Sequence, residues 1–169
     1  VVVHSLTKLV MAYLHENENS IHPEKTYLQT SRITIETTET IYEHFEKFIR
    51  LSADLKFELA KRLKRKSFKK RRLVLDANNV CRESYFITSG ILRTYFLKDG
   101  KEISEYFCGV NEWVNSPKSF TQRKKDIYYI DAIEDTEVYT INVNDLVYLF
   151  EKFPEMERYA RLSMGSTFG

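Results

Sequence analysis

Short runs of alternating apolar and polar residues fill the middle of the chain, from Leu73 to Val143. Alternation puts every second side chain on one face of an extended strand, so each run predicts a strand with one buried face. Asp99-Gly100 is the strongest turn signal between runs, because a type I′ hairpin needs positive φ at both central residues. The runs are LVL, SYFITSG, ILRTYFL, KEISEYF, IYYIDAI and EVYTINV, and the other turn signals are Asn78-Asn79, Ser89-Gly90 and Glu134-Asp135. Many short strands with regular turns predict a mainly β domain: a sandwich, roll or barrel.

Helical spacing flanks this β region on both sides. The segment 40–51 begins with the capping-box pair Thr40 and Glu43 and carries its apolar residues on one face. Ser52 is placed to cap a second helix, SADLKFELAKRLKRK, whose leucines recur every four residues. Asn142 and Asp145 suit the start of a helical pattern, NDLVYLFEKF, which Pro154 separates from a last helix, EMERYARLSM.

The N-terminal part of the chain differs from the rest. Residues 1–39 combine a short amphipathic helix, a polar linker and an alternating arm, SRITIETTET, and carry no recognisable chemistry. We therefore divide the chain into an N-terminal extension over 1–39, a β domain with flanking helices over 40–153, and the start of a further helix over 154–169.

The composition fits one folded domain with an appendage. The 169 residues are 43% apolar, enough for a sizeable core, and 30% charged. No apolar run approaches the roughly 20 residues that cross a bilayer, and the N-terminus lacks the features of a secretory signal, so we expect a cytoplasmic protein without membrane contact. Cys81 and Cys108 are too few for a disulfide framework and are expected to be reduced.

The net charge of +2 is distributed unevenly. The segment KRLKRKSFKKRR, residues 61–72, holds nine basic residues and no acid, and we call it the basic strip. Such a density of cations would attract a phosphate backbone at low salt. Three interpretations stay open: a solvated face, an auxiliary contact with nucleic acid or another anion, and a membrane-surface contact. The candidate contact residues are Lys61, Arg62, Lys64, Arg65, Lys69, Lys70, Arg71 and Arg72.

The order of helices, an all-β middle and helices resembles the effector domain of the Crp/Fnr family of bacterial transcription regulators. The resemblance extends over residues 41–164 and implies a double-stranded β-helix, or jelly roll, of the cyclic-nucleotide-binding type. It rests on the order and spacing of Leu75 through Asn79, Tyr85-Phe86-Ile87, Ser89-Gly90, Leu97 through Glu102, Glu112-Trp113-Val114, Asp131 through Val138, and Phe153-Pro154-Glu155.

The chain departs from that family at the phosphate cassette. The resemblance implies a Gly-Glu pair that opens a short helix, followed by an Arg, so that free N–H groups and a guanidinium hold the cyclic phosphate. Here Gly-Glu falls on Asn115-Ser116, and the Arg falls on Asp126, whose carboxylate would repel a phosphate. Arg123 and Lys124 lie in the turn between them and are candidates for a displaced anion site, although a solvated turn is the simpler interpretation.

Other sensors and enzymes with related folds are disfavoured by the residues present. Iron–sulfur sensing needs about four thiolates, which exceeds the two cysteines. A haem or cupin-type metal in the roll needs histidines on its strands, whereas all four histidines precede the roll: His4, His15, His22 and His44. We expect no metal or other cofactor and no catalytic activity.

These observations predict the effector-sensing and dimerisation domain of a Crp/Fnr-like transcription regulator that has lost the standard cAMP site. The resemblance implies a homodimer formed through the helix that begins near Glu155. It also implies DNA contact only through a C-terminal lobe, which the residues up to Gly169 do not contain. The alternative is a stand-alone small-ligand-binding roll, or a regulatory module without DNA contact. The sequence does not identify the effector.

Overall fold

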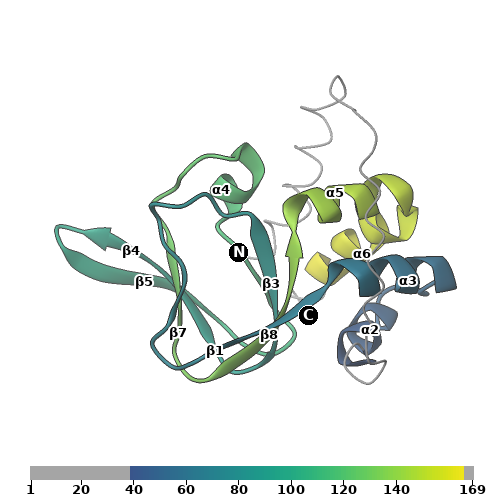
Figure 1. Cartoon of the computed structure of the whole chain (residues 1–169), viewed down its shortest axis with the longest axis horizontal. Helices are drawn as coiled ribbons and strands as arrows, with labels where there is room; N and C mark the ends of the chain where they lie inside the picture. The colour runs from purple at the N-terminus through teal and green to yellow at the C-terminus, as the bar shows by residue number, and fades with distance from the viewer. Residues whose placement is uncertain (1–38, 166–169) are drawn as a thin grey trace.

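The computed structural model describes residues 39–165 as two four-stranded antiparallel sheets with helices gathered on one side (Figure 1). One sheet has the order β1-β8-β3-β6, formed by β1 (Lys64–Phe68), β8 (Thr136–Asn142), β3 (Glu83–Ser89) and β6 (Trp113–Val114). The other has the order β2-β7-β4-β5, formed by β2 (Leu73–Leu75), β7 (Tyr129–Ala132), β4 (Leu92–Lys98) and β5 (Lys101–Cys108). Apart from the β4–β5 hairpin, neighbouring strands are distant in sequence. The predicted jelly roll of cyclic-nucleotide-binding type is confirmed.

Four helices lie together beside the roll in Figure 1, and a fifth belongs to the roll itself. The four are α2 (Glu39–Glu46), α3 (Ala53–Arg62), α5 (Val143–Lys152) and α6 (Pro154–Gly165). The fifth, α4 (Pro117–Gln122), connects β6 to β7. One apolar core joins the two parts, since Phe86 and Ile130 of the strands and Leu55 and Tyr159 of the helices are all buried in it.

Two turns have the backbone conformations that their sequences predict. Asp99 and Gly100 have φ values of 51° and 75°, as a type I′ hairpin requires, and they join Lys98 to Lys101. Gly90 has a φ of 94°, and a Cβ built there would lie 2.4 Å from Oγ1 of Thr136. The turn between β3 and β4 can therefore pass the β7–β8 loop only because residue 90 lacks a side chain.

The helix ends agree with the predicted caps in two cases and differ in one. Oγ of Ser52 accepts a hydrogen bond from the Leu55 N–H, and the Asn142 side chain accepts one from the Asn144 N–H. The last helix, α6, begins at Pro154, one residue before the predicted start near Glu155. The predicted helix over 40–51 is wrong at both ends, because α2 begins at Glu39 and ends at Glu46, so Thr40 lies inside the helix and cannot be its cap.

The basic strip does not continue α3 as a helix, which corrects the sequence-based prediction. The helix ends at Arg62, and Lys64–Phe68 pairs with β8 as an edge strand, Lys66 lying opposite Val138. Backbone pairing with β8 outweighs the helix propensity of lysine and arginine, whose side chains remain in solvent. Charged residues, lysine above all, are common on edge strands because they discourage pairing with other chains.

Two further sequence-based expectations concern the cysteines and the membrane. Cys81 and Cys108 are both free and buried, more deeply than the half-buried positions expected for them. No helix within residues 39–165 is long and apolar enough to cross a membrane. Most of the predicted N-terminal extension, including His4, His15 and His22, lies outside the described residues.

Candidate functional site

The segment predicted to correspond to the phosphate cassette connects β6 to α4. Asn115 is buried, and its Nδ2 donates to Oγ of Ser84 at 3.2 Å, so its side chain is directed into the roll. Ser116 is fully buried and precedes α4, which Pro117 opens. Proline has no N–H, and this removes one of the donors that a phosphate could use at the helix start.

Ser116 forms its hydrogen bonds with other side chains of the chain itself. The backbone N–H of Ser116 donates to Sγ of Cys81 at 3.5 Å, and its hydroxyl donates to Oδ2 of Asp126 at 3.5 Å. Burial raises the pKa of Cys81, so the thiol is neutral and donates in turn to the Glu83 carbonyl at 3.3 Å. A carboxylate and a buried thiol therefore face the cassette serine. Both groups are unsuited to an anionic ligand.

Among the basic residues of the α4–β7 turn, Arg123 contacts the start of α5. Arg123 ends α4 in the left-handed conformation, with φ 56°, and its Nη2 donates to Oδ1 of Asn144 at 2.7 Å at the start of α5. Lys124 is exposed. Of the five candidate pocket residues, the hydrogen bonds join Ser116 to Asp126, whereas Asn115 and Arg123 bond to Ser84 and Asn144.

A hydrogen-bonded chain links the strand before the cassette to the last helix. Nε1 of Trp113, on β6, donates to the Tyr159 hydroxyl of α6 at 2.9 Å. That hydroxyl lies 2.8 Å from Nε2 of His44 on α2. His44 also packs against Phe86, with ring centroids 4.8 Å apart. No local pattern predicts this contact, because His44 and Tyr159 are 115 residues apart.

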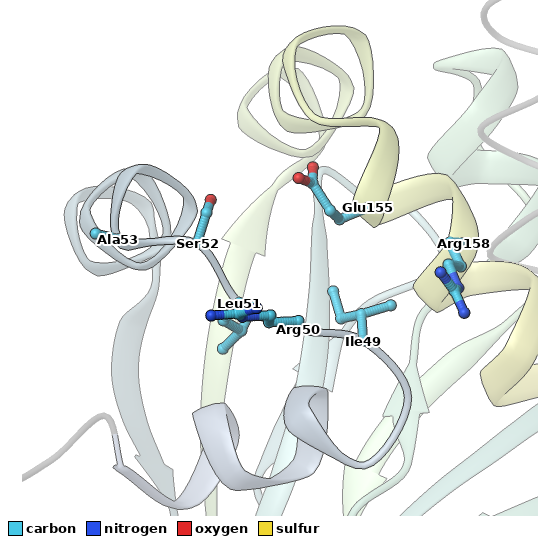
Figure 2. Close-up of a pocket in the computed structure, with 7 residues that line it drawn as sticks. All are labelled: Ile49, Arg50, Leu51, Ser52, Ala53, Glu155 and Arg158. Atoms are coloured by element: carbon cyan, nitrogen blue, oxygen red, sulfur yellow. The ribbon is translucent and has the colours of Figure 1, made fainter.

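A pocket of about 460 Å³ lies between the α2–α3 connection and the first turns of α6 (Figure 2). Its lining residues are Ile49, Arg50, Leu51, Ser52, Ala53, Glu155 and Arg158. The sequence does not predict this pocket, because each lining segment has the pattern of an ordinary helix end. It shares no residue with the cassette.

The basic strip divides between paired and unpaired cations. Lys61 and Arg62 pair with Glu58, Arg65 lies 3.5 Å from Glu137, and Lys69 lies 3.3 Å from Asp135. The other four candidates are exposed and form no ion pair within the described part of the chain: Lys64, Lys70, Arg71 and Arg72. Exposed pairs contribute little stability, but they reduce the charge that an outside anion can use.

Comparison with known proteins identifies a family for the roll. The sequence profile of the cyclic nucleotide-binding domain matches residues 65–153, which is more than half of the chain. No curated protein matches the chain in sequence.

Solved structures share the fold at low sequence identity. A CooA mutant from Carboxydothermus hydrogenoformans superimposes with a TM-score of 0.57 at 14% identity, over 81% of this chain and 82% of that one. A putative transcriptional regulator of the crp/fnr family from Eubacterium rectale gives 0.54 at 22% identity, over 70% and 56%. The regulatory subunit of a cAMP-independent protein kinase A from Trypanosoma brucei gives 0.54 at 18% identity, over 73% and 49%. The fold thus occurs in a transcription regulator and a kinase regulatory subunit, and this chain spans about half of each of these two.

Proposed function

The chain belongs to the family of cyclic nucleotide-binding domains, and we propose that it is the effector-sensing and dimerisation domain of a Crp/Fnr-like transcription regulator that has lost the standard cAMP site. Family membership indicates a regulatory rather than a catalytic domain. The observation that carries the proposal is the contact between Ser116 and Asp126. In the Crp/Fnr pattern these two positions hold the Glu and the Arg that bind ribose and phosphate.

Electrostatics explains why this cassette should reject a cyclic nucleotide. A cyclic phosphate carries a full negative charge and needs a guanidinium and free N–H groups to replace its water. At the position of the guanidinium stands the Asp126 carboxylate, and the Ser116 N–H already donates to Cys81. Binding would have to break that bond and hold two anions close together.

Calorimetric titration with cAMP and cGMP at moderate salt tests the loss of the site. We expect no heat of specific binding at micromolar ligand, and micromolar affinity for either nucleotide would show that the proposal is wrong. Asp126→Arg is the matched variant, because it returns the cation to the position where the family has one. If that variant binds cAMP no better than the unchanged chain, Asp126 is not by itself what excludes the nucleotide, because Ser116 and Pro117 still lack the contacts of the family pattern.

Subunit pairing through α6 is the second part of the proposal. The inner face of this helix is buried through Met156 and Tyr159, whereas Leu162 remains 38% exposed. A second copy of α6 would cover that leucine, and burial of a leucine side chain contributes about 1.5–3 kcal/mol. Sedimentation velocity should show a dimer that Leu162→Lys dissociates at least about tenfold more readily. A chain that is monomeric at every concentration would contradict this part.

A regulatory module without DNA contact is the alternative, and the likeness to a kinase regulatory subunit favours it. The two functions predict different kinds of domain after the roll. A helix-turn-helix encoded after Gly169 would support the transcription regulator, and a catalytic or second nucleotide-binding domain would support the alternative.

A further inference from the structure

Two exposed aromatic rings and two exposed lysines lie together on neighbouring helices, and we call these four residues the α3–α5 patch: Phe57 and Lys61 of α3, and Tyr148 and Lys152 of α5. Phe57 is 61% exposed, and Tyr148 is 36% exposed. Nζ of Lys61 lies 4.2 Å from the centroid of the Phe57 ring. The Arg62 guanidinium lies 4.1 Å from the centroid of the Tyr148 ring. A single exposed ring is common on protein surfaces, but these two rings belong to one cluster of charges.

The carboxylate of Glu58 joins the two helices of the patch. Its Oε1 lies 3.7 Å from Nζ of Lys61 and 3.6 Å from Nζ of Lys152. Two ammonium groups that contact the same oxygen at these distances are close enough for one further carboxylate to reach both. Neither lysine is enclosed, because their side chains are 50% and 48% exposed. The contacts of the folded chain therefore place two accessible cations around one point on the surface.

The charges of this cluster leave cations in excess. The Arg62 guanidinium donates to Oε2 of Glu58, so a hydrogen-bonded cation already balances this carboxylate. Both lysine distances to Glu58 are longer than a hydrogen bond, so the ammonium groups keep donors for another acceptor. Asp145 is the other carboxylate of the cluster and lies 3.6 Å from Nε of Arg62. Three cations thus face two carboxylates, and the exposed lysines carry the excess.

We propose that the α3–α5 patch docks an acidic segment of a partner protein. A carboxylate of that segment accepts from Lys61 and Lys152, and an apolar side chain next to it covers the Phe57 ring. Aromatic side chains are enriched in protein–protein interfaces, and charge-assisted hydrogen bonds beside a ring also fix the orientation of the partner. A nucleic acid fits less well, because its phosphates would meet the carboxylates of Glu58 and Asp145.

A hexapeptide, acetyl-EELFEE-amide, is the probe for such a segment. Titration of the full chain to millimolar peptide, followed by backbone amide chemical shifts, should move residues 57–62 and 145–152. Two related peptides separate the charge contact from the apolar contact: QQLFQQ lacks the carboxylates, and EEGSEE lacks the apolar side chains. Each should bind at least about threefold more weakly than EELFEE at physiological salt, since each loses one of the two contacts.

Phe57→Ala tests the apolar contact and has a matched control. The substitution should weaken EELFEE at least about threefold, because an apolar side chain of the peptide loses the ring that it covers. Phe107→Ala removes a ring with the same exposed fraction, 61%, from β5, which lies apart from α3 and α5 in Figure 1. The control should leave the affinity unchanged.

The double substitution of Lys61 and Lys152 to glutamine tests the charge contact. It should weaken EELFEE at least about threefold and leave QQLFQQ unchanged, because only the charged peptide uses the ammonium groups. The matched control changes Lys98 and Lys101 to glutamine, two exposed lysines at the β4–β5 turn, and lowers the net charge by the same amount. At physiological salt the Debye length is about 8 Å, so this control should leave both affinities unchanged.

The docking surface is wrong if EELFEE leaves the patch unshifted at millimolar concentration, or binds no more tightly than QQLFQQ and EEGSEE. A short duplex DNA that displaces EELFEE and binds Phe57→Ala more weakly would overturn it by assigning the patch to nucleic acid. A dimer that Phe57→Ala dissociates in sedimentation velocity would overturn it by assigning the patch to a second copy of the chain. None of these outcomes bears on the loss of the cassette, since the patch shares no residue with it.

Discussion

His44 is a titratable side chain held among aromatic rings in the helical layer. The Tyr159 hydroxyl accepts from Trp113 and lies 2.8 Å from Nε2 of His44, so the ring and the hydroxyl share one hydrogen bond whose direction depends on the tautomer of the imidazole. Burial, together with the nearby charge of Lys47, lowers the pKa of His44 from its usual 6.5 to about 4. The folded state therefore prefers the neutral ring across the mildly acidic range.

This preference predicts how stability changes with pH. Below its ordinary pKa the histidine binds a proton in the unfolded chain but not in the folded one, so acid favours unfolding down to the folded pKa. The free energy of unfolding should fall by about 2 kcal/mol as the pH falls from about 7.5 to about 5. Urea unfolding followed by the fluorescence of Trp113, the single tryptophan, measures it.

His44→Gln is the control for the pH prediction, because glutamine can accept from Tyr159 but does not titrate. The variant should lose the pH dependence above about pH 5 whatever its absolute stability, since carboxylates contribute mainly below that pH. The same dependence in both proteins would assign it to other groups.

At the scale of elements, the sequence predicted those turns and helix caps whose structure depends on residues a few positions apart. Asp99-Gly100, Ser52 and Asn142 each act through neighbours within a few residues, and their turn and caps were predicted correctly. Strand β1 was missed because its residues, KRKSF, show no apolar alternation. Its conformation depends on pairing with β8, about 70 residues later in the chain, which no local pattern reveals.

The same distinction separates the two candidate ligand sites. Ser116 and Asp126 are ten residues apart on either side of one short helix, and the spacing within a known pattern predicts that they meet. The α6 pocket joins residues 49–53 to Glu155 and Arg158, which lie about 100 residues later in the chain. Neither segment carries a motif, so the pocket becomes apparent only when the structure brings the two segments together. A site of this kind cannot be predicted from one sequence.

At the scale of the whole molecule, the basic strip is a weaker electrostatic feature than its sequence suggests. Neighbouring acids on α3, β8 and the β7–β8 loop pair with half of its candidate contact residues. Four exposed cations remain along β1 and the turn after it: Lys64, Lys70, Arg71 and Arg72. Such a surface attracts any phosphate backbone but cannot read bases, since sequence is read by side chains that reach base edges in a groove.

We therefore expect the chain to bind duplex DNA weakly, without discrimination between sequences, and with a steep dependence on salt. If all four unpaired cations reach phosphates, the logarithm of the binding constant should fall with the logarithm of salt with a slope between about −3 and −4. Changing these four residues to glutamine should remove most of that slope. The control changes four exposed lysines elsewhere on the fold to glutamine, so that the net charge falls by the same amount: Lys98, Lys101, Lys118 and Lys125.

If both variants lose the same affinity, the attraction comes from net charge rather than from the strip. Tight binding that survives physiological salt and distinguishes an operator from a scrambled sequence would mean that the chain holds a DNA reader, and would contradict the assignment of DNA recognition to a separate lobe.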